Sequence, residues 1–362
     1  MLKKYNMSKA FHRCLIMLVL CTVFCSCKEN KENDIYFEST SPLGKVKREG
    51  AFLEHLAGER LMLSQDIITA KAIRVKDDFL YISTSKKTQY IHKFNLKGEF
   101  QNALINKGHG PGEVSSIFNF NVGKDNGEPY LYVADLMQNK LLYQNAKDTL
   151  NIHFSNLMFD IVRLNDQNLI GIPIEEEKMF GIYNYRGELL STFGQFPKNK
   201  LTDVPYILSQ AYVGEYDYHE TKKVFVAALR YTDQLMIFSD LDNDENHVVI
   251  RGPLFYDPIF KVSDKYGSLE FSQDEEGRFS FIDVVLTNDY IIGLFSGYSR
   301  EERPGKAGFG DKIFLFDYSG KIINGFEISE KLISISYDDV NNMLYGLDVS
   351  GDEEEIFKYR LD

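Results

Sequence analysis

Cysteine is scarce in this chain of 362 residues, and its four copies all lie near the N-terminus, at Cys14, Cys21, Cys25 and Cys27. Any chain cut before Cys27 keeps a single cysteine. This scarcity excludes a disulfide framework, a thiolate metal site and a catalytic cysteine from the main body of the chain. The 336 residues that follow position 26 must be stabilised by a hydrophobic core, and they are numerous enough to build one.

The N-terminus lacks an apolar run long enough to cross a bilayer. The run from Cys14 to Cys25 has only twelve residues, and the segment before it is basic, with four Lys and Arg residues and no acid. A positive head followed by a short apolar middle is typical of a secretory signal and not of a membrane helix. We therefore predict a signal peptide over residues 1–26.

Positive charge is in short supply. The chain has 41 Lys and Arg against 53 Asp and Glu, and its net charge is −12. Because four of the basic residues lie in the predicted signal peptide, the remaining chain has a net charge of −16. Such an acidic surface repels phosphate backbones, so nucleic acid is excluded as a partner.

Sequence signatures of catalysis are also lacking. The histidines are scattered without metal-ligand spacing, and neither a serine nucleophile elbow nor a dinucleotide-binding loop is present. Asp240, Asp242 and Asp244 alternate as in a calcium loop, but Glu245 and Arg251 stand where an EF-hand needs Gly and Glu. We predict no catalytic residue, no metal ligand and no cofactor. Calcium is expected only if oxygen ligands from several strands converge.

What the chain does contain is a repeat. Residues 67–104 read as four short β-strands separated by turn residues, and the same order of strands recurs five more times. The later copies begin at Phe118, Met158, Ala211, Phe279 and Leu332. Four-stranded units repeated at this spacing are typical of β-propeller blades.

The sequence thus predicts an all-β fold, a six-bladed β-propeller of four-stranded antiparallel blades, over residues 35–362. Two ordinary β-sandwich domains are the alternative. Since the sixth copy lacks its outer strand, we expect an N-terminal strand to close the ring, either Asp34 to Ser39 or, as a rival, Arg60 to Ser64. Residues 27–34 are polar and read as a tether, and residues 41–65 as an irregular lead-in.

Two loops supply candidate binding residues. Gly108 to Glu113 (GHGPGE) is a tight, glycine-rich connection that could present His109 and Glu113 at a propeller face. Alternatively, the glycines and the proline only shape the crossover, and Glu113 caps backbone amides.

The second loop, Ser296 to Gly310, interrupts the fifth repeat. It is basic within an acidic chain, and long loops of this kind are functional or disordered. Its Tyr298, Arg300 and Arg303 are candidate ligand-binding residues. Several polar residues of the predicted inner strands could also line a central channel: Arg74, Asn119, Asp160, Arg163, Tyr212, Glu215, Asp283 and Tyr337.

Two motifs carry a resemblance to known proteins. The segment Val23 to Cys27 (VFCSC) resembles a bacterial lipobox, with Cys27 as the residue that would be acylated. With this segment, the repeats, the Asn95 to Glu99 turn and above all Gly108 to Glu113, the chain resembles the TolB-like six-bladed propeller lipoproteins of gut bacteria. The resemblance implies a lipoprotein of the cell envelope, anchored in the outer membrane and facing either the periplasm or the exterior. It supplies no catalytic residues.

Together these observations favour a binding or scaffold propeller that takes a glycan, a peptide or an envelope protein and is held on the membrane through its lipid anchor. The alternative is a metal-dependent enzyme of lactonase, lyase or hydrolase type with its site in the central channel.

Overall fold

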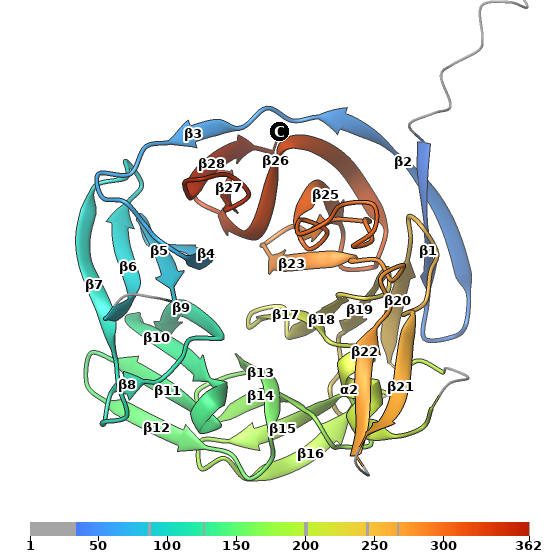
Figure 1. Cartoon of the computed structure of the whole chain (residues 1–362), viewed down its shortest axis with the longest axis horizontal. Helices are drawn as coiled ribbons and strands as arrows, with labels where there is room; N and C mark the ends of the chain where they lie inside the picture. The colour runs from blue at the N-terminus through green and yellow to red at the C-terminus, as the bar shows by residue number, and fades with distance from the viewer. Residues whose placement is uncertain are drawn as a thin grey trace, which may run out of the picture.

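The computed structural model describes residues 34–85, 88–125, 127–198, 202–243, 246–265 and 268–361. The predicted signal peptide, the acylation site Cys27 and the tether as far as residue 33 lie outside this range. Within it, β-strands form a ring of six blades around a central channel (Figure 1), so the predicted six-bladed propeller is confirmed.

Each blade is an antiparallel sheet whose first strand faces the channel. The first three blades are built from consecutive strands. They are β4 (Ala70–Lys76), β5 (Phe79–Thr84), β6 (Gln89–Asn95) and β7 (Phe100–Lys107), edged by β8 (Glu113–Val114); β9 (Asn119–Asp125), β10 (Glu128–Asp135), β11 (Lys140–Asn145) and β12 (Thr149–His153); and β13 (Met158–Arg163), β14 (Asn168–Pro173), β15 (Phe180–Asn184) and β16 (Leu189–Phe193).

The other three blades share the long strand β26 and strands from the N-terminus. Blade 5 ends on the first half of β26, and blade 6 begins with its second half. The strands are β17 (Gly214–His219), β18 (Val224–Leu229), β19 (Gln234–Phe238) and β20 (His247–Arg251); β23 (Phe281–Leu286), β24 (Ile291–Phe295), β25 (Gly310–Phe316) and β26 (Ile322–Asp338); and β27 (Met343–Asp348), β28 (Glu355–Arg360) and β3 (Glu59–Leu61).

The ring is closed by β3, the outer strand of blade 6, which pairs with β28 through Leu61 opposite Ile356 and Glu59 opposite Lys358. Closure by an N-terminal strand is confirmed, but Asp34 to Ser39 was the wrong donor and the rival segment that begins at Arg60 supplies it. The physical reason is the short connection between β3 and β4. In blades 1 and 2 too, the outer strand is followed after a short crossover by the inner strand of the next blade.

The segment from Asp34 has another position. Strand β1 (Asp34–Thr40) pairs with β20 of blade 4, and β2 (Val46–His55) pairs with β1 and, in parallel, with β26 of blade 5. The two strands therefore bridge two blades at the perimeter of the ring (Figure 1). The predicted irregular lead-in over residues 41–65 is wrong, because it contains both β2 and β3.

One turn recurs between the third and fourth strands. In Asn95 to Glu99, the Asn95 Oδ1 atom accepts hydrogen bonds from the backbone N–H groups of Lys97 and Glu99, both at 3.0 Å. Gly98 has φ of +84°, and a Cβ atom there would lie 2.0 Å from the carbonyl oxygen of Met62. Glycine is thus required both for the backbone conformation and for the close approach of the preceding blade edge. Gly187 and Gly320 hold the corresponding positive φ in blades 3 and 5.

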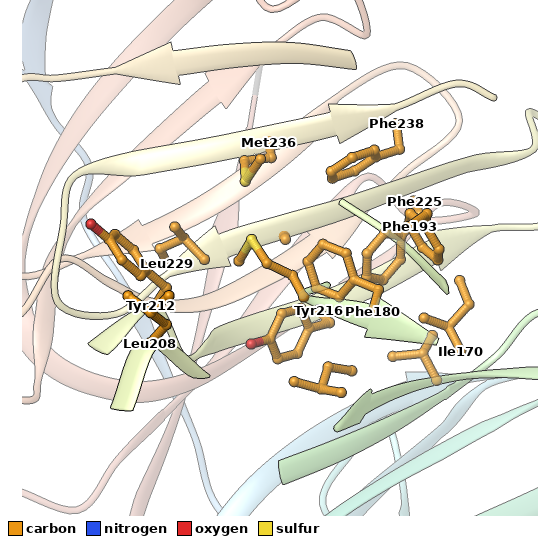
Figure 2. Close-up of a cluster of buried hydrophobic side chains, with 14 of the residues drawn as sticks. Ile170, Phe180, Phe193, Leu208, Tyr212, Tyr216, Phe225, Leu229, Met236 and Phe238 are labelled. Atoms are coloured by element: carbon orange, nitrogen blue, oxygen red, sulfur yellow. The ribbon is translucent and has the colours of Figure 1, made fainter. Parts of the chain in front are cut away.

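The core consists of side chains packed between neighbouring blades. Between blades 3 and 4, Phe180 makes ring contacts with Phe193, Tyr216, Phe225 and Phe238 at centroid distances from 4.9 to 5.9 Å (Figure 2). The two blades supply rings to the same cluster, so this packing fixes the angle between them.

Two connections carry additional structure. Helix α2 (Pro205–Ala211) lies between blades 3 and 4. Between blades 4 and 5, strands β21 (Phe260–Lys265) and β22 (Ser268–Gln273) form a separate hairpin, and β22 contacts α2. We name the face of the ring at which the inner strands begin the front face. The strands of a blade alternate in direction, so the fourth strand ends at the front face, and both connections begin there.

Candidate functional site

The central channel is lined by polar side chains that the inner strands direct inward. A β-bulge near the start of β4, β13, β23 and the second half of β26 shifts the register by one residue, and the residues that follow are Ala72, Asp160, Asp283 and Ser334. Bulges re-aim side chains. Here they place equivalent positions of several blades at the same depth of the channel.

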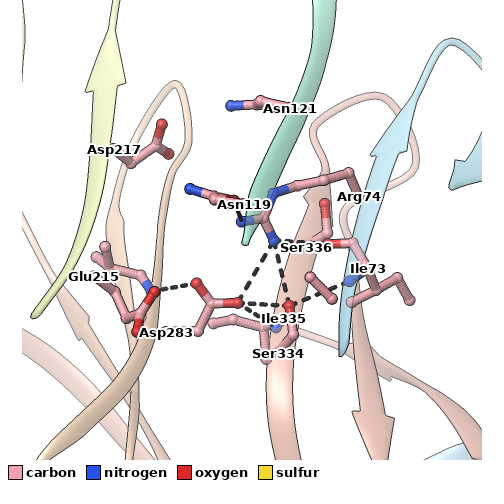
Figure 3. Close-up of polar contacts among 12 residues, drawn as sticks. Ile73, Arg74, Asn119, Asn121, Glu215, Asp217, Asp283, Ser334, Ile335 and Ser336 are labelled. Atoms are coloured by element: carbon pink, nitrogen blue, oxygen red, sulfur yellow. Dashed lines mark hydrogen bonds and ion pairs between the residues drawn. The ribbon is translucent and has the colours of Figure 1, made fainter. Parts of the chain in front are cut away.

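Asp283 and Arg74 form the centre of this polar layer (Figure 3). The Asp283 Oδ2 atom accepts hydrogen bonds from the Ser334 hydroxyl at 2.7 Å and from the Ile335 backbone N–H at 2.9 Å, and it lies 3.6 Å from Arg74 Nη1. The side chain of Asp283 is 5% exposed and that of Arg74 is 18% exposed. Asp283 is therefore buried, and Arg74 is partly buried beside it.

Many of these bonds connect one blade to the next. Ser334 and Ser336 of blade 6 accept hydrogen bonds from the backbone N–H groups of Ile73 and Val75 in blade 1, at 3.2 and 2.8 Å. Asp217 of blade 4 accepts from the N–H of Leu286 in blade 5 at 2.9 Å. The channel lining thus has a structural role, because it ties the inner edges of neighbouring blades together.

The tie between blades 1, 2 and 3 runs through Asn119. Its amide oxygen lies 3.4 Å from Arg74 Nη2, and its amide nitrogen donates to both carboxylate oxygens of Asp160, at 3.1 and 2.9 Å. Burial, together with the charge of Glu215, raises the pKa of Asp160 to about 7, although the Ile161 backbone N–H, Asn119 and Arg74 act in the opposite direction.

Glu215 and Arg230 differ from the residues above, since both belong to blade 4 and they pair with each other. Their side chains are 21% and 35% exposed, more than those of Asp283 and Arg74. The side chains of Glu215 and Arg230 are therefore partly solvated and do not join blades. They are the charged groups of this layer that are most accessible to a ligand.

A cavity of about 490 Å³ opens at the front face, and we name it the front funnel. Its floor consists of polar residues of the layer described above: Arg74, Asn119, Asp160, Glu215, Arg230, Asp283 and Ser334. Its upper wall is mostly apolar, with Ile117, Phe118, Phe279 and Ile333, and Lys71 stands at its rim. The ring of Phe118 is 52% exposed. A second cavity of about 460 Å³ opens at the opposite face, where Tyr337 is among its lining residues.

Sequence reasoning identified most of the floor correctly. Arg74, Asn119, Asp160, Glu215 and Asp283 all line the front funnel. Tyr212 does not, because it is buried in the core between blades 3 and 4, and Arg163 is buried with its guanidinium 4.7 Å from the ring centre of Tyr130.

Sequence reasoning missed Arg230, Phe118 and Ser334. Arg230 directly follows the buried strand β18, where it can reach an inner-strand acid of the same blade. The only feature of the sequence that indicates a role for Arg230 is its position directly after the apolar strand β18.

The loop Gly108 to Glu113 closes on itself. The Glu113 Oε2 atom accepts a hydrogen bond from the Gly110 backbone N–H at 2.9 Å, and a Cβ atom on Gly108 would lie 1.9 Å from this oxygen. The carboxylate therefore caps the loop, and the glycines are required by its close approach. His109 is exposed at the loop surface.

The loop Ser296 to Gly310 lies over blade 5, beside the front funnel. The guanidinium of Arg303 lies 3.4 Å from the ring centre of Tyr298 and pairs with the buried Asp311 at 2.7 Å, while Lys312 and Lys331 pair with the same carboxylate. Arg300 is exposed and lies 5.4 Å from the ring centre of Phe279, a wall residue of the funnel. Arg300 is thus near the funnel, whereas Arg303 is engaged within the loop.

The two predicted binding loops are not brought together. The first joins blades 1 and 2, and the second belongs to blade 5. Within the described residues, no group of three or more His, Cys, Asp and Glu side chains is arranged to hold a metal ion. No helix in the same residues is long and apolar enough to cross a membrane.

The raised pKa of Asp160 gives a testable pH dependence. Its ordinary value is 3.8, so between about pH 4 and pH 7 the folded state binds more protons than the unfolded state. The resulting stabilisation is full below this window and is lost as the pH rises through 7. Asp160→Asn, which cannot titrate, is expected to reduce the fall in stability between pH 5 and pH 8. Urea unfolding midpoints across this range measure it, and parallel curves for the two proteins would contradict the assignment.

Comparison with known proteins agrees with this architecture. A member of the DUF4221 family from Bacteroides vulgatus has a similar structure, with 12% identity, 86% of this chain and 97% of that chain covered, and a TM-score of 0.52. A putative exported protein from Bacteroides fragilis follows with 15% identity, 85% and 95% coverage and a TM-score of 0.48. A search of curated protein sequences returns no match.

At 12% identity the likeness to the DUF4221 protein concerns the fold alone. The sequence itself is more informative, because residues 67–339 match the TolB-like 6-blade propeller-like family. This match covers most of the chain and agrees with the resemblance seen in its motifs. The chain therefore belongs to the TolB-like 6-blade propeller-like family.

Proposed function

We propose that this protein is a lipid-anchored binding propeller of the bacterial cell envelope that takes an oligosaccharide in its front funnel. Export and acylation at Cys27 are supported by the basic leader, the short apolar run and the lipobox-like segment. The observation that carries the binding role is the composition of the funnel, whose apolar and aromatic wall stands above a floor of paired acidic, basic and amide groups.

This composition suits a sugar better than a strongly charged ligand. Each sugar hydroxyl both donates and accepts hydrogen bonds, so it requires donors and acceptors side by side, as Arg230 and Glu215 provide. The apolar face of a sugar ring can pack on an exposed aromatic ring such as that of Phe118. The three acids and three bases that line the funnel leave it without a strong field of either sign.

The test is a thermal-shift screen of the protein against glycan fragments, including peptidoglycan fragments, and against peptides. A ligand at 100 times its dissociation constant should stabilise the folded state by about 2.7 kcal/mol. We expect an oligosaccharide to raise the melting temperature of the unaltered protein and to lose most of this effect in Phe118→Ala. The side chain of Phe118 is exposed, so its removal should leave the fold intact.

The matched control is Tyr206→Ala, which removes an exposed aromatic ring of helix α2 that does not line the funnel. It should respond to the oligosaccharide as the unaltered protein does. Stabilisation by peptides alone would replace the glycan with a peptide ligand. An oligosaccharide response that Phe118→Ala leaves unchanged would move the binding site away from the front funnel.

A further inference from the structure

The perimeter of the ring carries an aromatic surface where the chain enters it. Strands β1 and β2 form the N-terminal ribbon, residues 34–55, whose two faces differ. The inner face packs on the core through Phe37, with Ile35, Ala51 and Leu53. The register pairs Asp34 with Phe52, Tyr36 with Gly50 and Thr40 with Val46. Because side chains alternate along a strand, Tyr36, Val46 and Phe52 share the outer face, and all three are exposed.

A loop of blade 4 extends this outer face. Leu254 and Phe255 follow β20 and are 48% and 38% exposed. The Arg48 guanidinium lies 4.9 Å from the ring centre of Tyr36 and 5.8 Å from that of Phe255, so it connects the ribbon to the loop. We name the surface formed by Tyr36, Val46, Arg48, Phe52, Leu254 and Phe255 the perimeter patch.

The exposure of Leu254 and Phe255 is built into the structure. The carboxylate of the buried Asp233 accepts hydrogen bonds from three consecutive backbone N–H groups, those of Leu254 at 2.8 Å, Phe255, and Tyr256 at 3.3 Å. Phe255 has φ of +57°, a conformation that is unfavourable for a residue other than glycine. A buried acid thus holds two large apolar side chains toward solvent, and such a constraint indicates a role for them.

The sequence before β1 determines what this patch can meet. Six residues separate Asp34 from Cys27, and even a fully extended segment from Cys27 to Asp34 spans only about 25 Å. Residues 28–33 (KENKEN) are all polar, so they cannot cover an apolar surface. A lipid on Cys27 would therefore keep this edge of the ring, rather than the opposite edge, at the membrane surface.

We infer that the perimeter patch lies on the membrane that holds the anchor, with Phe255, Leu254 and Phe52 in the interfacial layer. This inference rests on the acylation of Cys27 in the proposed function. Aromatic and apolar side chains accompanied by basic ones are suited to the boundary between headgroups and acyl chains. Arg48 lies 3.7 Å from Glu38 in an exposed ion pair, and its guanidinium can also reach a lipid phosphate. Lys45, which directly precedes β2, and Lys47 within β2 add positive charge in a chain that is otherwise acidic.

The patch lies on the perimeter of the ring, at its front-face end, because Leu254 and Phe255 follow the end of β20. Since β1 and β2 lie at the outside of the ring (Figure 1), the propeller would stand on its edge, and the channel would run along the membrane plane. Both ends of the channel would then remain open to solvent.

The chain has no tryptophan, so a single introduced indole reports its own surroundings. One variant, Phe255→Trp, carries the indole in the perimeter patch. The control variant is Val340→Trp, because Val340 lies in a turn of blade 6 and is 88% exposed. Each full-length acylated protein is reconstituted into vesicles of phosphatidylethanolamine and phosphatidylglycerol. The emission of Phe255→Trp should shift to shorter wavelength and be quenched by brominated acyl chains. That of Val340→Trp should change in neither respect.

Equal quenching of the two indoles, or none at position 255, would overturn the inference. A blue-shifted indole in Phe255→Trp before vesicles are added would also overturn it, because a second copy of the chain would then cover the patch. The mass of the purified protein reports acylation independently. If Cys27 carries no lipid, the proposed anchor fails, and addition of the same two proteins to preformed vesicles still decides whether the patch has affinity for a membrane.

Discussion

Asp283→Ala should lower the free energy of unfolding by about 3–5 kcal/mol, the cost of removing one partner of a buried ion pair. The loss of the carboxylate leaves the Ser334 hydroxyl and the Ile335 backbone N–H without this acceptor. It also removes the charge that balances the Arg74 guanidinium, which keeps its hydrogen bond to the Ile73 carbonyl. The effect is large because these partners belong to blades 6 and 1, so the substitution weakens the border between blades 5 and 6.

Urea unfolding, followed by circular dichroism at constant pH, measures this change. Asp352→Ala is the matched control, because Asp352 is exposed and its loss should change stability by less than about 0.5 kcal/mol. The double variant with Arg74→Met separates the ion pair from the other contacts. If Asp283→Ala costs no more than the control, the polar layer does not stabilise the ring.

Phe180→Ala should cost about 3–5 kcal/mol, the range for removal of a buried aromatic side chain from a core. Phe180 is fully buried, and its ring contacts two blades through four other aromatic rings. The neighbours are large and fixed by their own contacts, so they cannot collapse into the space. The cost therefore includes both the lost burial and the cavity that remains.

The measurement is the urea midpoint, with the m-value checked for a change in cooperativity. Phe180→Leu keeps most of the volume and should cost less than half as much. Leu190→Ala, at an exposed position of β16 in the same blade, should have little effect. A loss below about 1 kcal/mol for Phe180→Ala would show that the cluster adapts to the missing ring.

The fold could be predicted because its signals are local and repeated. The turn at Asn95 to Glu99 needs only an Asn side chain and one glycine, and related turns recur in blades 3 and 5. The closure of the ring was harder, since β1 and β3 are both short and strand-like. What separates them is their partners, β20 and β28, which lie about 200 to 300 residues later in the chain. No local pattern encodes such a pairing.

The site was predictable only in part, for a similar reason. Arg74 and Asp283 stand out as polar residues in apolar strands, but their pairing depends on bulges that shift the register by one residue. Tyr212 was misplaced because it lies just outside β17 and turns into the core. Whether His109, Glu113, Tyr298, Arg300 and Arg303 bind a ligand stays a prediction.

The way β1 is built into the ring also bears on mechanical force. Asp34 to Thr40 pairs with β2 at seven positions, and Glu38, Ser39 and Thr40 pair with β20 on the other side. The hydrogen bonds of an antiparallel pair run perpendicular to the strands. Tension that arrives along β1 from an anchored end would therefore load these bonds in shear, all at once, instead of peeling them apart one after another. Blades 4 and 5 would thus both oppose a pull on β1, because β1 pairs with β20 and, through β2, is connected to β26.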